Sequence, residues 1–437
     1  MKTKQHQGMK HLFISGIICF MIPTWTFSQV TTNEELKQLV QQSYSYYPKM
    51  AEAENNIVTA EEKKSMVELN SKPEISANGN YNYVLPKIAF PINGREIQFA
   101  PVHNVGAMLN ASWTIYDFGR LKAEIDKEKA SIQLSKDQVE VTKSQLKAQV
   151  AGIYYTMVFL KKYLTIEDSI IRFYQDNQKL AERRVSDGEG LQTDVLNFKS
   201  NVDAEENKKL DLQMALSKQQ NMLAYTTGVS EIKGDDFDFS RLATLYESGP
   251  GRVEKVENKN PELTMANDKI MAAKKGMNAA ILSNKPTLNI HAGGGIKNGY
   301  VPEVNDMRFN SVAGITFMMP LDAFGKTNQQ KKYQQTLVKQ QELSLHSLQS
   351  QLEKDIKQNN SNYWYLRSKI KNSENQIKAA KEAQQLIISR YQNGVATFVD
   401  LSAAEANVER AYLSKLQDEY QMCMENIELA KLMGYDY

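Results

Sequence analysis

Four segments of the chain alternate between apolar and polar side chains. In each segment, aliphatic, aromatic or small residues are separated by single positions that carry mainly asparagine, serine or threonine. A side-chain period of two predicts β-strands with one apolar and one polar face. The segments are residues 75–85, 105–115, 287–297 and 313–321, the last being the weakest because Val312 and Met318 fall on its polar face. The sequence therefore predicts two β-hairpins, residues 75–115 and 287–321.

Alternation over about ten residues is typical of strands that face lipid on one side and a water-filled interior on the other. The side chains expected to face lipid are Tyr81, Tyr83, Leu109, Trp113, Ile315 and Phe317. Tyrosine and tryptophan suit the boundary between lipid and water. A half-buried strand of a soluble β-sandwich alternates in the same way, so the pattern alone leaves both alternatives open.

Four strands are too few to close a barrel by themselves. An open sheet edge cannot lie in lipid, because its unpaired amides would have no hydrogen-bond partner. A membrane location therefore requires several chains to share one barrel. Two chains would supply about eight strands, whose interior is largely filled by side chains, and three would supply about twelve, with room for a channel.

Two further stretches carry an apolar residue at every seventh position. These residues are Ile125, Ile132, Val139, Leu146, Ile153 and Leu160 in the first stretch, and Ile356, Tyr363, Ile370 and Ile377 in the second. A seven-residue repeat predicts helices that supercoil against neighbours. We expect long helices over residues 119–187 and 325–393, where about 65 residues at ~1.5 Å each span nearly 100 Å. Helices of this length must pack on other helices in a bundle or tube.

Each long helix is followed by a glycine-containing turn and a return helix. The return helices are predicted over residues 191–227 and 397–433. Gly188 and Gly394 suit the left-handed conformation that ends many helices. Asp194 and Asp400 fall in the first turn of the return helices, where a carboxylate is favoured by the helix dipole. Helix capping alone is a sufficient explanation for both acids.

The same landmarks occur twice along the chain. Pro48 and Pro73 lie 25 residues apart, as do Pro261 and Pro286, and Gly119, Gly188 and Asp194 recur 206 residues later as Gly325, Gly394 and Asp400. Such spacing predicts an internal two-fold repeat of helix, β-hairpin, long helix and return helix. The copies are predicted over residues 29–228 and 260–437, joined by an irregular connector at residues 229–259.

The N-terminal segment has the layout of a secretory signal. Residues 2–11 carry three lysines and no acid, residues 12–23 are apolar, and small residues surround Ser28. We therefore expect a signal peptide over residues 1–28, although a buried N-terminal helix is an alternative. No later apolar run approaches the roughly 18 to 20 residues of a membrane-spanning helix. The sequence predicts an exported protein without a helical anchor.

Composition excludes several other classes. Removing the three lysines of the predicted signal from the 53 basic residues leaves 50, against 51 acidic residues, so no basic excess for nucleic-acid binding remains. The two cysteines, Cys19 and Cys423, cannot form a disulfide framework. The histidines outside the signal, His103, His291 and His346, have no second ligand at metal spacing. We expect no enzyme, cofactor or metal site.

The duplicated layout, the alternating hairpins and the paired turns resemble the TolC-type outer-membrane factors. The segments that carry the resemblance are APVHNVGAMLNASWTIYDFG, RFNSVAGITFMMPLDAFG and, most specifically, RYQNGVATFVDL. It covers essentially all of the expected mature chain. It implies an α+β membrane protein: a homotrimer with a twelve-stranded β-barrel in the outer membrane, four strands per chain, continued by a long α-helical coiled-coil barrel in the periplasm. The connector would then belong to an equatorial belt.

The resemblance also implies a role for the helical turns as a periplasmic tip that closes the channel at rest. Asp194 and Tyr391 match residues that bridge adjacent helical pairs, and Asp400 matches an acid that lines the entrance. The positions expected to contact an adaptor protein are Gly188, Leu191, Gly394 and Val395. Ala403 and Ala396 stand where some members have a second ring acid and a basic latch residue.

The function expected from the resemblance is that of an exit duct in a tripartite efflux pump. Small molecules would pass through it passively from a periplasmic adaptor and an inner-membrane transporter to the outside. An export duct for type I protein secretion is one alternative, and a periplasmic coiled-coil scaffold without a pore is another. The sequence does not decide which cargo is carried, because the transporter selects it.

Overall fold

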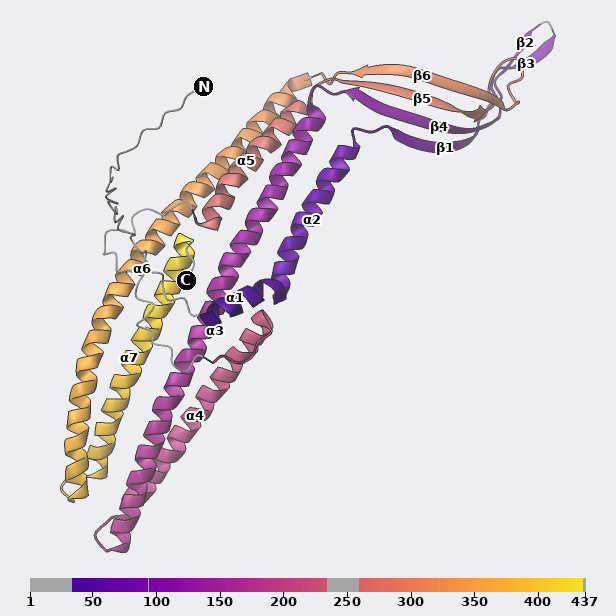
Figure 1. The fold of residues 1–437 in the computed structure, drawn as a ribbon. Helices are drawn as coiled ribbons and strands as arrows, with labels where there is room; N and C mark the ends of the chain where they lie inside the picture. The colour runs from indigo at the N-terminus through magenta and orange to yellow at the C-terminus, as the bar shows by residue number, and fades with distance from the viewer. Residues whose placement is uncertain (1–33, 93, 234–258, 322, 435–437) are drawn as a thin grey trace, which may run out of the picture.

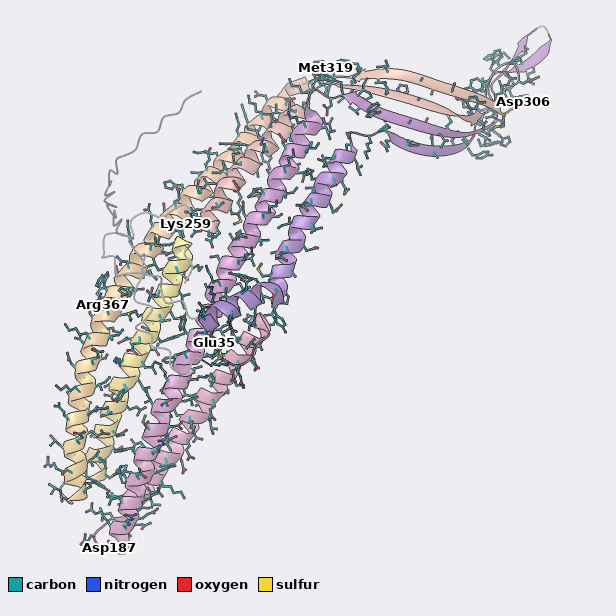
Figure 2. The ribbon with its side chains drawn as sticks, in the orientation of Figure 1. Glu35, Asp187, Lys259, Asp306, Met319 and Arg367 are labelled. Atoms are coloured by element: carbon teal, nitrogen blue, oxygen red, sulfur yellow. The ribbon has the colours of Figure 1, made fainter. Side chains whose placement is uncertain are left out.

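The computed structural model describes residues 34–92, 94–233, 259–321 and 323–434. The predicted signal peptide and most of the predicted connector lie outside the described residues. The described chain forms an elongated bundle of helices with an antiparallel sheet at one end, set at an angle to the bundle (Figure 1). Asp187 lies at the free end of the helical bundle, and Asp306 lies at the end of the main sheet away from the helices (Figure 2).

Helices make up most of the described chain. They are α1 (Glu34–Tyr46), α2 (Pro48–Leu69), α3 (Arg120–Ser186), α4 (Gln192–Thr227), α5 (Pro261–Leu282), α6 (Lys326–Gln392) and α7 (Phe398–Met433), and a 3₁₀ turn, η3 (Ala323–Gly325), precedes α6. α3 and α6 contain 67 residues each, which makes each about 100 Å long at ~1.5 Å per residue. None of the described helices combines the length and the apolar character needed to cross a bilayer.

The long helices pack in antiparallel pairs. α3 packs along α4, and α6 packs along α7. Contacts between α3 and α7 join the two pairs, while α5 contacts both α3 and α6 nearer the sheet (Figure 1). The hydrophobic side chains are buried in three separate clusters along the bundle, one of them beside the α3–α4 and α6–α7 turns. A bundle this long therefore has a core distributed along its length.

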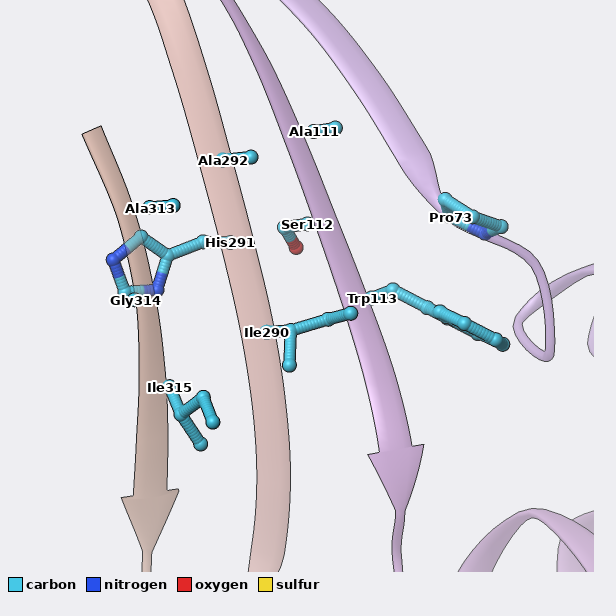
Figure 3. Close-up of a pocket in the computed structure, with 10 residues that line it drawn as sticks. All are labelled: Pro73, Ala111, Ser112, Trp113, Ile290, His291, Ala292, Ala313, Gly314 and Ile315. Atoms are coloured by element: carbon cyan, nitrogen blue, oxygen red, sulfur yellow. The ribbon is translucent and has the colours of Figure 1, made fainter. Parts of the chain in front are cut away.

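The main sheet contains four antiparallel strands. They are β1 (Glu74–Tyr83), β4 (His103–Tyr116), β5 (Thr287–Lys297) and β6 (Arg308–Met318), in the order β1-β4-β5-β6. The pairing aligns apolar residues in rows across the strands, as in the row Ala111, Ala292 and Ala313 (Figure 3). No described helix covers either face of this sheet (Figure 1). The sheet is a single layer with two free edges, β1 and β6, among the described strands.

Two features of the structure have no counterpart in the sequence analysis. A short two-stranded sheet of β2 (Ala89–Ile92) and β3 (Arg95–Gln98) lies between β1 and β4 in the chain and projects beyond the main sheet (Figure 1). The helix α1 is separated from α2 at Tyr47, where extended backbone precedes Pro48. Proline favours this break, because it restrains the residue before it to extended conformations.

Candidate functional site at the helical turns

The two turns between long helices have the same backbone conformation. Gly188 follows α3 with φ +75°, and Gly394 follows α6 with φ +73°. Each glycine N–H donates to a carbonyl oxygen in the last helical turn, Val185 at 3.1 Å and Tyr391 at 3.0 Å. The left-handed conformation is cheap only for glycine and a few polar residues, so both glycines are needed to reverse the chain here.

The turns lie beside each other at the end of the bundle. A small hollow between them is lined by Ala181, Arg184, Glu189, Gly190, Leu191, Asp194, Tyr391, Gly394, Ala396, Thr397 and Phe398. Next to it, a buried apolar cluster includes Phe198 from α4, Leu401 from α7 and Tyr391 from α6. Side chains from four helices therefore meet here, which makes the turns one continuous site.

Tyr391 is the central buried residue of this site. Its side chain is 2% exposed, and its ring meets the Phe198 ring edge to face at 6.1 Å. Burial raises the pKa of the Tyr391 hydroxyl, and the charge of the nearby Asp194 raises it further. The structure thus brings together Asp194 and Tyr391, which sequence analysis selected as bridging residues, within one chain.

Arg184 is a member of the site that sequence analysis missed. Its guanidinium lies 5.5 Å from the centre of the Tyr391 ring. Its Nη1 also donates to the carbonyl oxygen of Tyr391 at 3.0 Å. A basic residue in the last turn of a helix is ordinarily explained by the helix dipole, so Arg184 carried no distinct sequence signal.

Asp400 has a different role in the structure. The Thr397 hydroxyl accepts from the Asp400 N–H at 3.2 Å, while the Thr397 N–H donates to Asp400 Oδ2 at 2.9 Å. This reciprocal pair is a capping box at the start of α7. The hydrogen bond from the Thr397 N–H, followed by that from its hydroxyl, lowers the pKa of Asp400. Asp400 is exposed and does not line the hollow that holds Asp194 and Tyr391.

The outer surface of the turns is apolar in part. Leu191 and Val395 are 65% and 66% exposed, and Gly188 and Gly394 are also exposed. These four residues, selected from sequence as adaptor contacts, are accessible in the single chain. Exposed large apolar side chains at the end of a bundle are typical of surfaces that bind another protein.

A second polar cluster lies farther along the bundle, where α3, α4 and α7 meet. Lys208 Nζ lies 3.3 Å from both Glu167 Oε2 and Glu205 Oε2, and it also pairs with Glu409. The three carboxylates place oxygens within 4.8 Å of one another, close enough to hold a metal ion. The ammonium of Lys208 contacts all three and supplies the positive charge instead. Sequence analysis missed this cluster because its members are dispersed over three helices.

The side chains predicted to face lipid all lie on the main sheet. The exposed fractions are 62% for Tyr81, 59% for Tyr83, 62% for Leu109, 39% for Trp113, 71% for Ile315 and 60% for Phe317. Trp113 pairs with Ile290, which pairs with Ile315, so these residues form one apolar row beside the row of three alanines (Figure 3). The indole N–H of Trp113 donates to the Ser71 carbonyl at 2.7 Å, which holds the ring against the segment that leads into β1.

The fold is similar to those of solved outer-membrane channels. The Vibrio cholerae outer membrane protein VceC shares 16% sequence identity, with a TM-score of 0.71 over 92% of this chain and 96% of that chain. The Neisseria gonorrhoeae MtrE outer membrane channel, in its open state, shares 15%, with a TM-score of 0.73 over 92% and 89%. The Campylobacter jejuni CmeC outer membrane channel shares 13%, with a TM-score of 0.69 over 92% and 86%. These similarities establish a TolC-type fold.

Sequence comparison identifies the family. The profile of the outer membrane efflux protein family matches residues 39–229 and 253–435. The chain therefore belongs to the outer membrane efflux protein family, which confirms the resemblance found in the sequence. The predicted location in the outer membrane, with a large periplasmic helical portion, is confirmed as well. Comparison with curated protein sequences gives no significant match.

Proposed function

We propose that three copies of this chain form an outer-membrane exit duct of a tripartite efflux pump. The duct conducts small molecules passively, from a periplasmic adaptor and an inner-membrane transporter to the outside. The observation that carries this proposal is the single-layer sheet at the end of helices about 100 Å long. Such a sheet needs lipid on its apolar face and more strands at its edges.

The uncovered sheet favours a barrel over a soluble sandwich. A sandwich buries the apolar face of each sheet against a second layer. No second layer covers this sheet among the described elements, and large apolar residues such as Leu109 and Ile315 are 62% and 71% exposed. Pairing β1 of one chain with β6 of the next satisfies the edge amides. Three chains joined in this way give a twelve-stranded barrel with space for a channel.

The paired elements also support an internal duplication. α2 and α5 have 22 residues each, α3 and α6 have 67, and α4 and α7 have 36. Two equal sets of long helices per chain, repeated in a trimer, supply a tube of six helical pairs. In this duct the turns close the periplasmic end. The contact between Asp194 and Tyr391 holds the two pairs of one chain together, and Leu191 and Val395 meet the adaptor.

The first test is the native mass and conductance of the mature protein extracted from outer membranes with detergent. We expect three chains per particle and discrete conductance steps in planar bilayers. Release from membranes without detergent, as a monomer that conducts no ions, would contradict the duct and support the periplasmic scaffold. A trimer that co-purifies with a protein-exporting transporter would instead identify the duct of a type I secretion system.

A pair of neighbouring substitutions tests the orientation of the sheet. Leu109→Arg places a charge on the proposed lipid face of β4, whereas Asn110→Arg places the same charge on the opposite face. Arginine at the middle of a bilayer costs roughly 2–4 kcal/mol in barrel strands. We therefore expect Leu109→Arg to reduce the amount of assembled trimer in the outer membrane much more than Asn110→Arg. Equal losses would contradict the assignment of the two faces.

A further inference from the structure

The cluster around Lys208 joins the two helical pairs of the chain at a second place, away from the turns. Glu167 belongs to α3, Glu205 and Lys208 belong to α4, and Glu409 belongs to α7. Counting residues from the turns places the cluster about 15–30 Å along the helices. Because Glu409 is on α7, its contact with Lys208 ties the α6–α7 pair to the α3–α4 pair (Figure 1).

The cluster contains more acidic groups than basic ones. Three carboxylates surround one ammonium, and the side chain of Glu167 has no exposed surface. Burial raises the pKa of Glu167 to about 8, and the neighbouring Glu205 carboxyl adds to this rise against the opposing charge of Lys208. Burial alone would lower the pKa of Lys208, but its hydrogen bond and ion pair with Glu409 raise it well above the ordinary value. Glu167 therefore holds its proton to a higher pH than an exposed glutamate does, while Lys208 stays charged.

A second buried acid lies one turn away on α7. Glu405 is 5% exposed and accepts a hydrogen bond from Gln384 of α6. Burial raises the pKa of Glu405 to about 7, the bond from Gln384 lowers it, and the charges of Glu409 and Glu205 raise it. From α3, the hydroxyl of Tyr174 and the ring of Tyr163, 5.8 Å from Lys208 Nζ, complete the surroundings. Two buried acids that favour the protonated form therefore lie where the helical pairs meet.

We propose that Glu167, Glu205, Lys208, Glu405 and Glu409 form a proton-sensitive latch that holds α7 against the α3–α4 pair. It restrains separation of the helical pairs together with the Tyr391 contact at the turns and the packing of α3 on α7. This latch depends on the proposed function in one respect, which is that separation of the helical pairs is taken to open the duct. The docking itself is a property of the single chain.

The direction of the pH effect follows from the two buried acids. Both carboxyls hold a proton in the docked arrangement at pH values where an exposed glutamate, with its ordinary pKa near 4.5, is ionised. Separation of the pairs exposes them and releases these protons. Docking is therefore strongest below pH 4.5 and weakens as pH rises through about 7 and about 8. Each released proton lowers the docking constant by up to about tenfold per pH unit.

The test measures the distance between the pairs directly. Spin labels are placed on α4 and α7 through Leu196→Cys and Val399→Cys, which are 58% and 69% exposed, in a Cys423→Ala background. Labelled full-length chains are diluted with unlabelled chains, so that the distance within one chain dominates. We expect one short distance at pH 5.5 and a growing population of longer distances at pH 8. An unchanged distribution would overturn the proposal.

Three variants assign the effect to the cluster. Glu167→Gln combined with Glu405→Gln keeps the side-chain shape without a titrating group, so the short distance should persist at pH 8. Lys208→Met removes the cation and should increase the long-distance population at pH 8. Asp168→Asn breaks a partly exposed ion pair with Lys209, 2.7 Å long, that joins α3 to α4 without involving α7. This control should retain the wild-type pH response.

The outcomes separate this proposal from the proposed function. A full pH response in the double glutamine variant would overturn the latch, because the response would then come from other groups. A distance change that depends on Glu167 and Glu405, in a protein that conducts no ions at any pH, would support the latch and contradict the duct. Conductance that rises with pH, and does so less in the glutamine variant, would support both.

Discussion

The turn between α3 and α4 and the turn between α6 and α7 share a sequence layout but use their acids differently. Asp194 and Asp400 occupy positions 206 residues apart, each six residues after a left-handed glycine. Asp400 is bound to Thr397 in a capping box. In the other turn the N-cap residue is Leu191, which has no side-chain acceptor. The Asp194 carboxylate is therefore not held in a cap, and its charge raises the pKa of Tyr391. One residue at the start of each return helix therefore decides whether the acid is used for local structure or for a contact between pairs.

The residues that precede the two glycines also have different roles in the two turns. Arg184 and Arg390 are equivalent in the repeat, as are Val185 and Tyr391. Only Arg184 crosses to the other turn, where it lies over the Tyr391 ring. An aromatic ring attracts a cation more strongly than an aliphatic side chain does. Placing the ring in one turn and the cation and acid in the other makes the contact asymmetric, although the backbone is not.

The largest expected effect comes from removing the ring that joins the turns. Tyr391→Ala deletes a fully packed aromatic side chain and should cost about 3–5 kcal/mol of local stability. Limited proteolysis of the assembled protein should then cleave both turns much faster. Val185→Ala at the equivalent, half-buried position of the other turn should have a small effect. Tyr391→Phe keeps the ring and loses only the hydroxyl, so comparable cleavage in this variant would contradict the role of packing.

A smaller effect is expected from the tight backbone in the first turn. A Cβ on Gly190 would lie 2.7 Å from the Val185 nitrogen and 2.8 Å from the Arg184 carbonyl carbon, whereas the equivalent residue, Ala396, has a Cβ. Gly190→Ala must move the main chain and should cost about 1–3 kcal/mol. Hydrogen–deuterium exchange of residues 183–196 should increase. Ala396→Gly should cost less than about 1 kcal/mol, and equal effects would show that the turns are packed alike.

Much of the helical architecture follows from sequence patterns that have a direct physical cause. Heptads without proline specify long paired helices, and paired glycines specify their reversal, so the TolC-type fold is accessible from sequence. The strand β2 and the helix α1 were not anticipated. A strand of four residues is too short for its alternation to stand out, and Pro48 marks the start of α2 without indicating the helix before it.

The site was predictable only where a residue could be compared with its repeat or with the family. Asp194 and Tyr391 were selected in this way, and the structure places them together. Arg184 and Lys208 were not selected, because charged residues on exposed helix faces are common and periodicity does not indicate which of them cross to another helix. The distinct role of Asp400 follows from the hydroxyl of Thr397, whose direction depends on the folded backbone.

The capping box provides a test of moderate size. Thr397→Ala removes the side-chain acceptor for the Asp400 N–H and should cost about 1 kcal/mol at the start of α7. Leu191→Ala removes no cap and only an exposed side chain, so the start of α4 should be almost unaffected. Hydrogen–deuterium exchange of the first turn of each return helix compares the two. Equal increases would mean that the starts of α4 and α7 are stabilised in the same way.

The smallest expected effect is the acid sensitivity of the second turn. The hydrogen bonds from Thr397 lower the pKa of Asp400 below its ordinary value of 3.8, so their stabilisation is present above pH 3.8 and is lost as pH falls through the lowered pKa. Pepsin, which is active in acid, should cleave near Phe398 slowly at pH 4 and faster at pH 2, relative to cleavage near Leu196 in the uncapped turn. In Thr397→Ala this relative increase should become smaller, because Asp400 loses the hydroxyl partner and keeps only the main-chain N–H of residue 397. A relative rate that rises equally in both proteins would mean that the acid effect arises outside the cap, and that the two turns differ in sequence but not in how their acids are held.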